Sequence, residues 1–277
     1  MKFGIREVCN IAFKARSEGT KMGTKVFKKD EVVIFFDSAK TSSLSGSSTE
    51  VAAQGGRGNP KLITWEGEKE IVFTFEEALI SPIGMAILTG ANLIDDNSGY
   101  YHQVRLRAVA TEANKLDIEA EVHEIGGLSA TINDPAAVDA SPEAKAGALF
   151  VYKEDGTEVT DITVAGNVIS AAAGIEVGKI YTVDGYVKVA GSTISIEANK
   201  FSDYFYIEAE TLFRQEADGV DKAAQIIIPK GKVKSNFEFT MANSGDPSTF
   251  AFEVTALEDF TKFDRTKKVQ AVINIID

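Results

Sequence analysis

Hydrophobic and polar residues alternate along much of the chain. In residues 70–76, Ile71, Phe73 and Phe75 fall on one face of an extended segment, and residues 101–109 repeat the pattern. Such alternation, enriched in β-branched and aromatic side chains, is typical of half-buried strands. Further strands are expected at residues 31–36, 116–122, 148–152, 159–168, 177–183, 186–189, 193–198, 204–213, 223–229, 234–240, 250–257 and 269–276. The pattern therefore predicts a mainly β protein.

One segment has helical rather than strand spacing. Ser81 can cap a helix, and Pro82 suits the first helical position. Apolar residues then recur at helical intervals until Gly90, which can end a helix. We predict a short helix at residues 82–89 that plugs one face or end of the sheet system.

Residues 37–60 interrupt the strand pattern. They are rich in Ser, Gly and Thr, and their large apolar residues are Leu44 and Val51. A segment of this composition cannot offset its own ordering entropy. We expect a long loop that is either a flexible linker or a segment that orders on a neighbour. The single tryptophan, Trp65, is expected to pack against the sheet beside a turn at Gly67.

The composition changes near residues 126–127. Residues 128–149 are rich in Ala, Asp, Pro and Ser, and short strand patterns then recur about every ten residues up to residue 190. This spacing is typical of small β-sandwiches. We predict a small β module at residues 128–190, inserted into a larger domain formed by residues 1–127 and 191–277.

Composition and charge restrict the function. The chain has 277 residues and is 44% hydrophobic, and its 41 acidic residues exceed its 29 basic ones, for a net charge of −12. An acidic chain is poorly suited to wrapping nucleic-acid phosphates. One cysteine, Cys9, and two histidines, His102 and His123, argue against a disulfide framework or a zinc site. Cys9 is expected to be an inert, packed thiol.

The hydrophobic pattern of the sequence also predicts no targeting segment. No run approaches the roughly 18 apolar residues that a membrane helix needs. Residues 1–7 do not resemble the apolar core of a signal peptide. We therefore expect a protein made and kept in a cytoplasm, or in a particle assembled there.

Candidate catalytic and binding motifs are weak. Gly55–Pro60 is glycine-rich, but a strand pattern follows it where a phosphate loop needs Lys-Ser/Thr and a helix. Asp95–Gly99 resembles the start of a calcium loop, yet Leu106 stands where a bidentate Glu belongs. No Gly-x-Ser-x-Gly occurs, and no pair among the many carboxylates stands out as a glycosidase pair. We expect no enzymatic activity, no metal and no cofactor.

Two stretches carry a family resemblance. The first is Gly55-Gly56-Arg57-Gly58-Asn59-Pro60 with the strand that follows to Glu70, continued by residues 73–82. The second is residues 201–252, which include Ile228-Pro229-Lys230 and Gly245-Asp246-Pro247-Ser248. Together they resemble tail tube (major tail) proteins of tailed bacteriophages, particularly those that infect Gram-positive hosts. The middle module resembles the immunoglobulin-like inserts that such proteins often carry.

The resemblance implies a tail-tube-type β-sandwich or barrel with one short flanking helix and a small Ig-like β module. Subunits would form hexameric rings that stack into a hollow tube, the conduit for DNA ejection. Strands of neighbouring subunits would join into one inner barrel, which also removes open sheet edges. The 37–60 segment would order against neighbouring subunits or rings. The residues expected to take part in this assembly are Ser42, Ser43, Leu44, Val51, Gln54, Arg57 and Asn59.

The same resemblance implies partners and a location. The tube would lie in the virion tail, be assembled in the host cytoplasm, and contact a tape measure protein, a sheath or a tail terminator, without membrane insertion. An acidic lumen would repel DNA phosphates and keep transit non-specific. The candidate lumen carboxylates are Glu119, Glu121, Glu208 and Glu210, each of which can equally belong to a solvated face.

Two other classes of protein remain open. A surface adhesin or carbohydrate-binding β module would be an exported, stable monomer, and the missing signal-peptide pattern argues against it. Another virion shell component, such as a capsid or decoration protein, is the second alternative. A capsid subunit is expected to contain a long helix, and no segment of the sequence predicts one.

Overall fold

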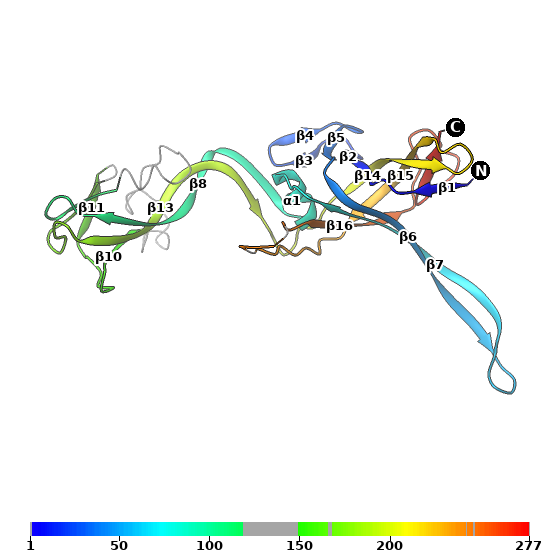
Figure 1. Ribbon diagram of the computed structural model, residues 1–277, viewed down its shortest axis with the longest axis horizontal. Helices are drawn as coiled ribbons and strands as arrows, with labels where there is room; N and C mark the ends of the chain where they lie inside the picture. Colours follow the sequence, from blue (N-terminus) through cyan, green and yellow to red (C-terminus); the bar gives the residue numbers. More distant parts are fainter. Residues whose placement is uncertain (1, 119–148, 166–167, 242, 246, 277) are drawn as a thin grey trace. The chain divides into compact units, whose positions relative to one another are not determined.

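The computed structural model describes residues 2–118, 149–165, 168–241, 243–245 and 247–276. These residues form two compact units, the first made of Met1–Ile94 and Ile194–Asp277 and the second of Asp95–Thr193. Strands dominate both units (Figure 1), and the one helix in the described part of the chain is α1 (Pro82–Thr89). The prediction of a mainly β fold is confirmed.

The first unit is built on an antiparallel sheet of nine strands among its described residues. Its order is β5-β2-β14-β15-β16-β7-β6, with β1 also paired to β14 and β17 to β15. A separate hairpin joins β3 (Thr20–Met22) and β4 (Lys25–Phe27). The strands of the large sheet are β1 (Phe3–Ile5), β2 (Asn10–Ala15), β5 (Val32–Phe36), β6 (Ala39–Gln54), β7 (Lys61–Glu77), β14 (Tyr204–Gln215), β15 (Asp221–Val233), β16 (Phe250–Leu257) and β17 (Val272–Ile275).

The sheet curls around an aromatic core. Phe36 on the edge strand β5 lies 5.0 Å from Phe75 on β7 and 4.9 Å from Phe252 on β16, between ring centroids. Phe75 and Phe252 are stacked at 4.7 Å, and Phe13 of β2 packs on Phe36 at 5.2 Å. Side chains from both ends of the sheet therefore meet in one core. The described strands do not close into a barrel, because β5 and β6 remain unpaired edges.

A buried carboxylate holds the corner between these two edges. The chain passes from β5 to β6 through residues 37–38, and Glu77 of β7 lies beside that corner with 2% of its surface exposed. Its Oε1 accepts the Ser38 backbone N–H at 2.9 Å and also the Ser38 hydroxyl. Nearby, the Ser42 hydroxyl oxygen accepts the Cys9 backbone N–H at 3.1 Å. These contacts tie β6 to the start of β2 across the open side of the curl.

The helix forms at the residues that its sequence signals predict. The Ser81 side chain accepts the Gly84 backbone N–H at 3.1 Å, and Pro82 occupies the first turn. Gly90 ends the helix with φ 69°. A side chain at Gly90 would also lie 2.7 Å from the Ser202 backbone nitrogen, so glycine is required on two counts. Ile87 and Leu88 are buried in the core of the first unit, as the prediction of a plugging helix requires.

Two local predictions were wrong, and one strand was not predicted. Residues 37–60 do not form a loop, because β6 pairs with β7 over nearly its whole length. The serines of β6 are compatible with a strand, because pairing with β7 rather than the hydrophobicity of β6 itself holds the segment extended. Residues 234–240 are irregular, since β15 ends at Val233. β2 was missed because its alternation covers three apolar positions only, although Ile11, Phe13 and Ala15 are all buried there.

The second unit has its own core. Two three-stranded sheets, in the orders β10-β13-β8 and β11-β12-β9, share one cluster of buried residues that includes Leu106, Leu116, Val151, Ile169 and Tyr181. The strands are β8 (Asn92–Val109), β9 (Lys115–Asp117), β10 (Leu149–Lys153), β11 (Ile162–Ala165), β12 (Val168–Ala171) and β13 (Ile180–Ser195). The predicted module at 128–190 falls within this unit, and its residues 128–148 lie outside the described part of the chain.

Candidate assembly surface

The β6–β7 hairpin has two parts with different surroundings. In the proximal part, residues 39–46 pair with 71–77, and Leu44 lies opposite the fully buried Phe73 and packs against the core. In the distal part, which we call the distal arm (residues 47–70), almost every side chain is exposed. Figure 1 shows the arm extending beyond the rest of its sheet. The arm is therefore a two-stranded ribbon with no core of its own.

The distal arm exposes large apolar side chains. Val51 and Leu62 are each 65% exposed, Ile63 is 55% exposed and Trp65 is 54% exposed. Val51 lies directly opposite Trp65, and Ala53 opposite Ile63. Because side chains two residues apart share a face, these four residues lie on one side of the ribbon. The prediction that Trp65 packs against the sheet was wrong, and the tryptophan instead belongs to an exposed apolar face.

Backbone features shape the arm. The pairing shifts register between Ser48 and Glu50, and the Thr49 hydroxyl oxygen at this bulge accepts the Glu68 backbone N–H at 2.9 Å. Gly67 faces the Thr49 hydroxyl so closely that a Cβ would displace it. Bulges bend and twist a strand pair locally. The sequence thus fixes where the arm departs from the direction of the sheet.

The turn at the tip is also internally braced. Gly56 and Gly58 have φ of 84° and 89°, and Asn59 has φ 50°. The Asn59 side-chain amide donates to Gln54 Oε1 at 3.0 Å. Glycine and asparagine are the residues that tolerate this backbone region. The glycine-rich motif therefore serves a turn, in agreement with its sequence context.

The arm is nearly neutral. Residues 47–70 contain four glutamates against Arg57, Lys61 and Lys69, a net charge of −1, whereas the whole chain carries −12. Lys61 pairs with Glu50 at 2.9 Å, which offsets the repulsion between Glu50 and the opposite Glu66. A neutral, apolar ribbon on an acidic protein can approach another copy with little electrostatic repulsion.

The seven predicted assembly residues do not form one surface. Ser42 is engaged inside the fold by Cys9, Leu44 packs against the core, and Ser43 is exposed on the proximal part. Val51, Gln54, Arg57 and Asn59 lie on the distal arm. Sequence reasoning did not assign Leu62, Ile63 or Trp65 to the assembly surface, and it expected Trp65 to pack against the sheet.

The predicted lumen carboxylates differ from one another. Glu208 and Glu210 lie on the same face of β14. Glu208 is held by Lys14 and by Lys262, the latter at 3.6 Å, so its charge is compensated. Glu210 is exposed. Glu119 and Glu121 lie outside the described residues.

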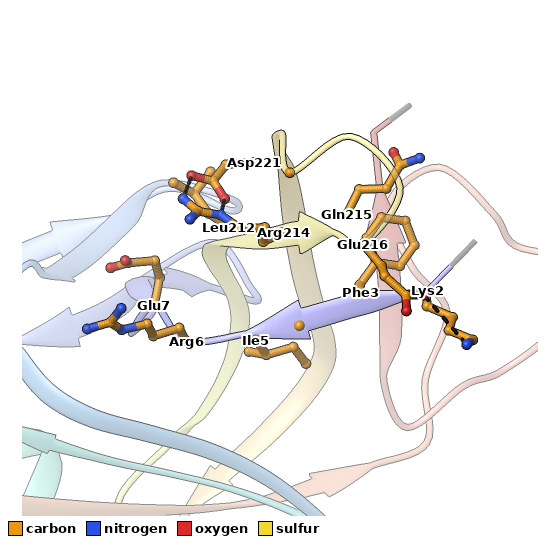
Figure 2. Close-up of a pocket in the computed structure, with 12 residues that line it drawn as sticks. Lys2, Phe3, Ile5, Arg6, Glu7, Leu212, Arg214, Gln215, Glu216 and Asp221 are labelled. Carbon is orange, nitrogen blue, oxygen red and sulfur yellow. Dashed lines mark hydrogen bonds and ion pairs between the residues drawn. The ribbon is translucent and has the colours of Figure 1, made fainter.

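A second exposed region lies at the end of β14. A hollow of about 750 Å³ is bounded by β1, the end of β14 and the turn to β15. Figure 2 shows Arg214 facing Asp221 there, with two hydrogen bonds of 2.6 Å. These bonds hold the pKa of Asp221 below its usual range. Ile5 on β1 is exposed, and β1 pairs with no described strand other than β14. Such an open edge can accept another strand.

Chemically reactive groups are scarce in the described residues. Cys9 is buried, and burial raises the pKa of its thiol, opposed by hydrogen bonds with Ser42 and Thr211. Cys9 is therefore packed in the core of the first unit, and its burial favours the thiol over the thiolate. No cluster of three or more His, Cys, Asp or Glu that could hold a metal occurs in the described ranges. Across the same residues, no helix has the length and apolar character needed to cross a membrane.

A curled antiparallel sheet, open edges and an exposed apolar ribbon are typical of a structural β protein that pairs with further chains. Comparison of the sequence with known protein families and proteins agrees with this class. The chain belongs to the YomU/Tube protein family, whose model matches residues 3–272. It is also 22% identical, over 246 residues, to the tail tube protein of Bacillus phage SPR, an alignment that spans 88% of this chain and 80% of that protein. The resemblance to phage tail tube proteins is thereby confirmed.

Proposed function

We propose that this chain is the repeating subunit of a phage tail tube, assembled as stacked hexameric rings through which DNA is ejected. The observation that carries the proposal is the distal arm, which presents Val51, Ile63 and Trp65 on one face with no core beneath them. An isolated two-stranded hairpin is marginally stable in water. The arm therefore gains most from a partner surface on another copy.

The energetics support such a contact. Burying the exposed part of a side chain such as Val51 or Ile63 stabilises by up to about 1.5–3 kcal/mol each. Six-fold repetition around a ring multiplies this contribution at every layer. A contact between an arm and a different surface of the next copy is heterologous, and heterologous contacts generate rings or open-ended filaments. A tube of stacked rings contains both kinds of contact, because each ring closes on itself and the stack of rings is open-ended.

Finer features of the proposal follow from the family. The tube would occupy the virion tail, form in the host cytoplasm, and end at partner proteins such as a tape measure protein, a sheath or a terminator. The subunit would be non-enzymatic. Of the two candidate lumen carboxylates in the described residues, Glu210 suits a lumen that repels DNA better than Glu208, because it is exposed and has no ion-pair partner among those residues. The module at 128–190 would lie outside the tube wall.

The proposal is tested with the double variant Ile63→Ser/Trp65→Ser. Electron microscopy and sedimentation of the purified chain should show rings or tubes for the unmodified protein and folded monomers for the variant. The control is Val26→Ser/Leu79→Ser, which removes two exposed apolar side chains outside the hairpin and should leave tubes intact. Tubes formed equally by the arm variant would overturn the role of the arm. A monomer at every concentration of the unmodified chain would overturn unaided self-assembly.

A further inference from the structure

A small polar pocket lies on the first unit, away from the hairpin's apolar face. It has a volume of about 250 Å³ and lies where the segment after β16 packs against the ends of β2 and β14. Ion pairs between Arg16 and Asp259, and between Lys262 and Glu208, hold that segment in place. The walls include the Tyr206 ring, Pro229 and Phe260. The pocket is thus built by elements far apart in the sequence.

Its charge is opposite to that of the protein. Four cationic side chains line it, from Arg16, Lys29, Lys262 and Arg265, against the carboxylates of Asp30 and Asp259. The lining therefore carries +2, whereas the chain carries −12. A concave site with an excess of one sign of charge attracts ions of the other sign. The expected ligand is an anion.

Two of these cationic side chains have no ion-pair partner among the described residues. Arg16 is paired with Asp259, and Lys262 with Asp30 at 3.3 Å. Lys29 and Arg265 form no ion pair with any described residue, and both are exposed at the pocket. Neighbouring positive charges repel one another when no anion lies between them. Lys29 and Arg265 are therefore available to an anion that enters the pocket.

A buried hydroxyl adds a second, independent observation. Tyr206 is 5% exposed, and the Lys262 ammonium lies 4.4 Å from the centre of its ring. The phenol makes no hydrogen bond of normal geometry with a described residue, although the backbone N–H of Lys262 faces it. That N–H is itself a donor, so the phenol proton lacks an acceptor. A buried donor without an acceptor is costly, so the phenol is a polar group beside the pocket that the fold leaves without a partner among the described residues.

We propose that the pocket lined by Arg16, Lys29 and Arg265 beside Tyr206 binds an oxyanion, either free phosphate or a carboxylate of a neighbouring copy. Arg and Lys form short, charge-assisted hydrogen bonds with both kinds of group. The volume admits one such group rather than an extended ligand. This site shares no residue with the distal arm. Binding of free phosphate does not depend on tube formation, whereas binding of a neighbour's carboxylate rests on the proposed assembly.

The first test measures phosphate binding by the unassembled chain. Calorimetric titration with sodium phosphate, against sodium chloride at equal ionic strength, should give saturable binding. The variant Lys29→Gln/Arg265→Gln should bind about tenfold more weakly or worse, because two charge-assisted contacts are lost. The control Lys21→Gln/Lys40→Gln removes the same charge from exposed lysines outside the pocket and should bind normally. Thermal unfolding in chloride checks that both variants are folded.

The second test identifies the source of the oxyanion. If a neighbouring carboxylate occupies the pocket, added phosphate and the Lys29→Gln/Arg265→Gln variant will both slow assembly, and the control variant will not. If free phosphate is the ligand, phosphate will bind without slowing assembly. A pocket variant that assembles slowly while the unmodified chain ignores phosphate also supports the carboxylate. Equal loss of binding in both variants, or no phosphate binding with normal assembly of the pocket variant, would overturn the site.

Discussion

The proximal part of the β6–β7 hairpin and its distal arm are made by the same two strands, yet they serve opposite purposes. In the proximal part, Phe73 and Phe75 are buried and complete the core. In the distal arm, Trp65 and Ile63 alternate in the same way but face solvent. Alternation in sequence thus reports a strand with one apolar face. The rest of the fold then determines whether the same chain covers that face or leaves it open to another chain.

The largest expected effect is a difference in the free energy of unfolding between a variant in the proximal part of the hairpin and one in the distal arm. Phe75→Ala removes a fully buried ring that stacks on Phe252 and should reduce the free energy of unfolding by about 3–5 kcal/mol. Trp65→Ala should change the stability of the unassembled chain by less than about 1 kcal/mol, because its side chain is already exposed. Urea denaturation at concentrations where the chain is monomeric measures both. A similar loss in the two variants would mean that the arm folds back onto its own chain.

The second effect concerns two glutamates of the hairpin. Glu77→Ala leaves the Ser38 backbone N–H and hydroxyl without their acceptor in a buried corner and should cost about 1–3 kcal/mol. Glu50→Ala breaks an exposed ion pair with Lys61 and should cost less than about 1 kcal/mol. Denaturant midpoints of the two single variants provide the comparison. Equal midpoints would show that the corner between β5 and β6 does not depend on Glu77.

These contrasts explain which features the sequence could predict. Helix α1 was predicted to the residue because Ser81, Pro82 and Gly90 act locally, within one or two turns. β16 was likewise predicted at residues 250–257, since alternation and burial coincide there. β6 was not predicted, because its serines and threonines carry no hydrophobic period and its pairing depends on β7. The strand is specified by its partner.

The candidate surface was only half predictable for a related reason. Val51, Gln54, Arg57 and Asn59 were assigned to assembly because their segment looked unable to fold alone, and they do lie on the arm. Trp65 was expected to pack against the sheet beside Gly67, and it is exposed instead. A sequence does not show whether an apolar face is buried within a chain or between chains. That distinction needed the register of Val51 opposite Trp65.

The third effect compares two glycines with positive φ. Gly90→Ala should cost about 1–3 kcal/mol or more, because strain adds to a contact of 2.7 Å with the Ser202 backbone. Gly56→Ala at the tip has φ 84° with open space around it, so strain alone should cost about 1 kcal/mol. Thermal unfolding of each variant, read beside tube formation, measures the difference. If Gly56→Ala destabilised the chain as much as Gly90→Ala, the tip would be better packed than its exposure indicates.

The smallest effect tests whether exposure alone makes an interaction weak. Arg214 and Asp221 are both exposed, like Lys61 and Glu50 on the arm, but Arg214 binds Asp221 through two bonds of 2.6 Å across adjacent strands. This geometry lowers the pKa of Asp221. The pair therefore stabilises the fold above the ordinary aspartate pKa of about 3.9, and the contribution disappears as the pH falls through the lowered value.

Carboxyl NMR titration of Arg214→Gln should return the pKa of Asp221 towards the ordinary value, whereas Lys222→Gln, the neighbouring cation that does not hold the carboxylate, should leave it low. The unfolding free energy should change little, since exposed pairs are screened by solvent. An unchanged pKa in Arg214→Gln would mean that nearby backbone, not the guanidinium, sets it. A restored pKa with little loss of stability would show that the Arg214–Asp221 pair orders an exposed surface without stabilising the fold. The apolar face of the distal arm differs, because burial against a partner is expected to supply binding energy there.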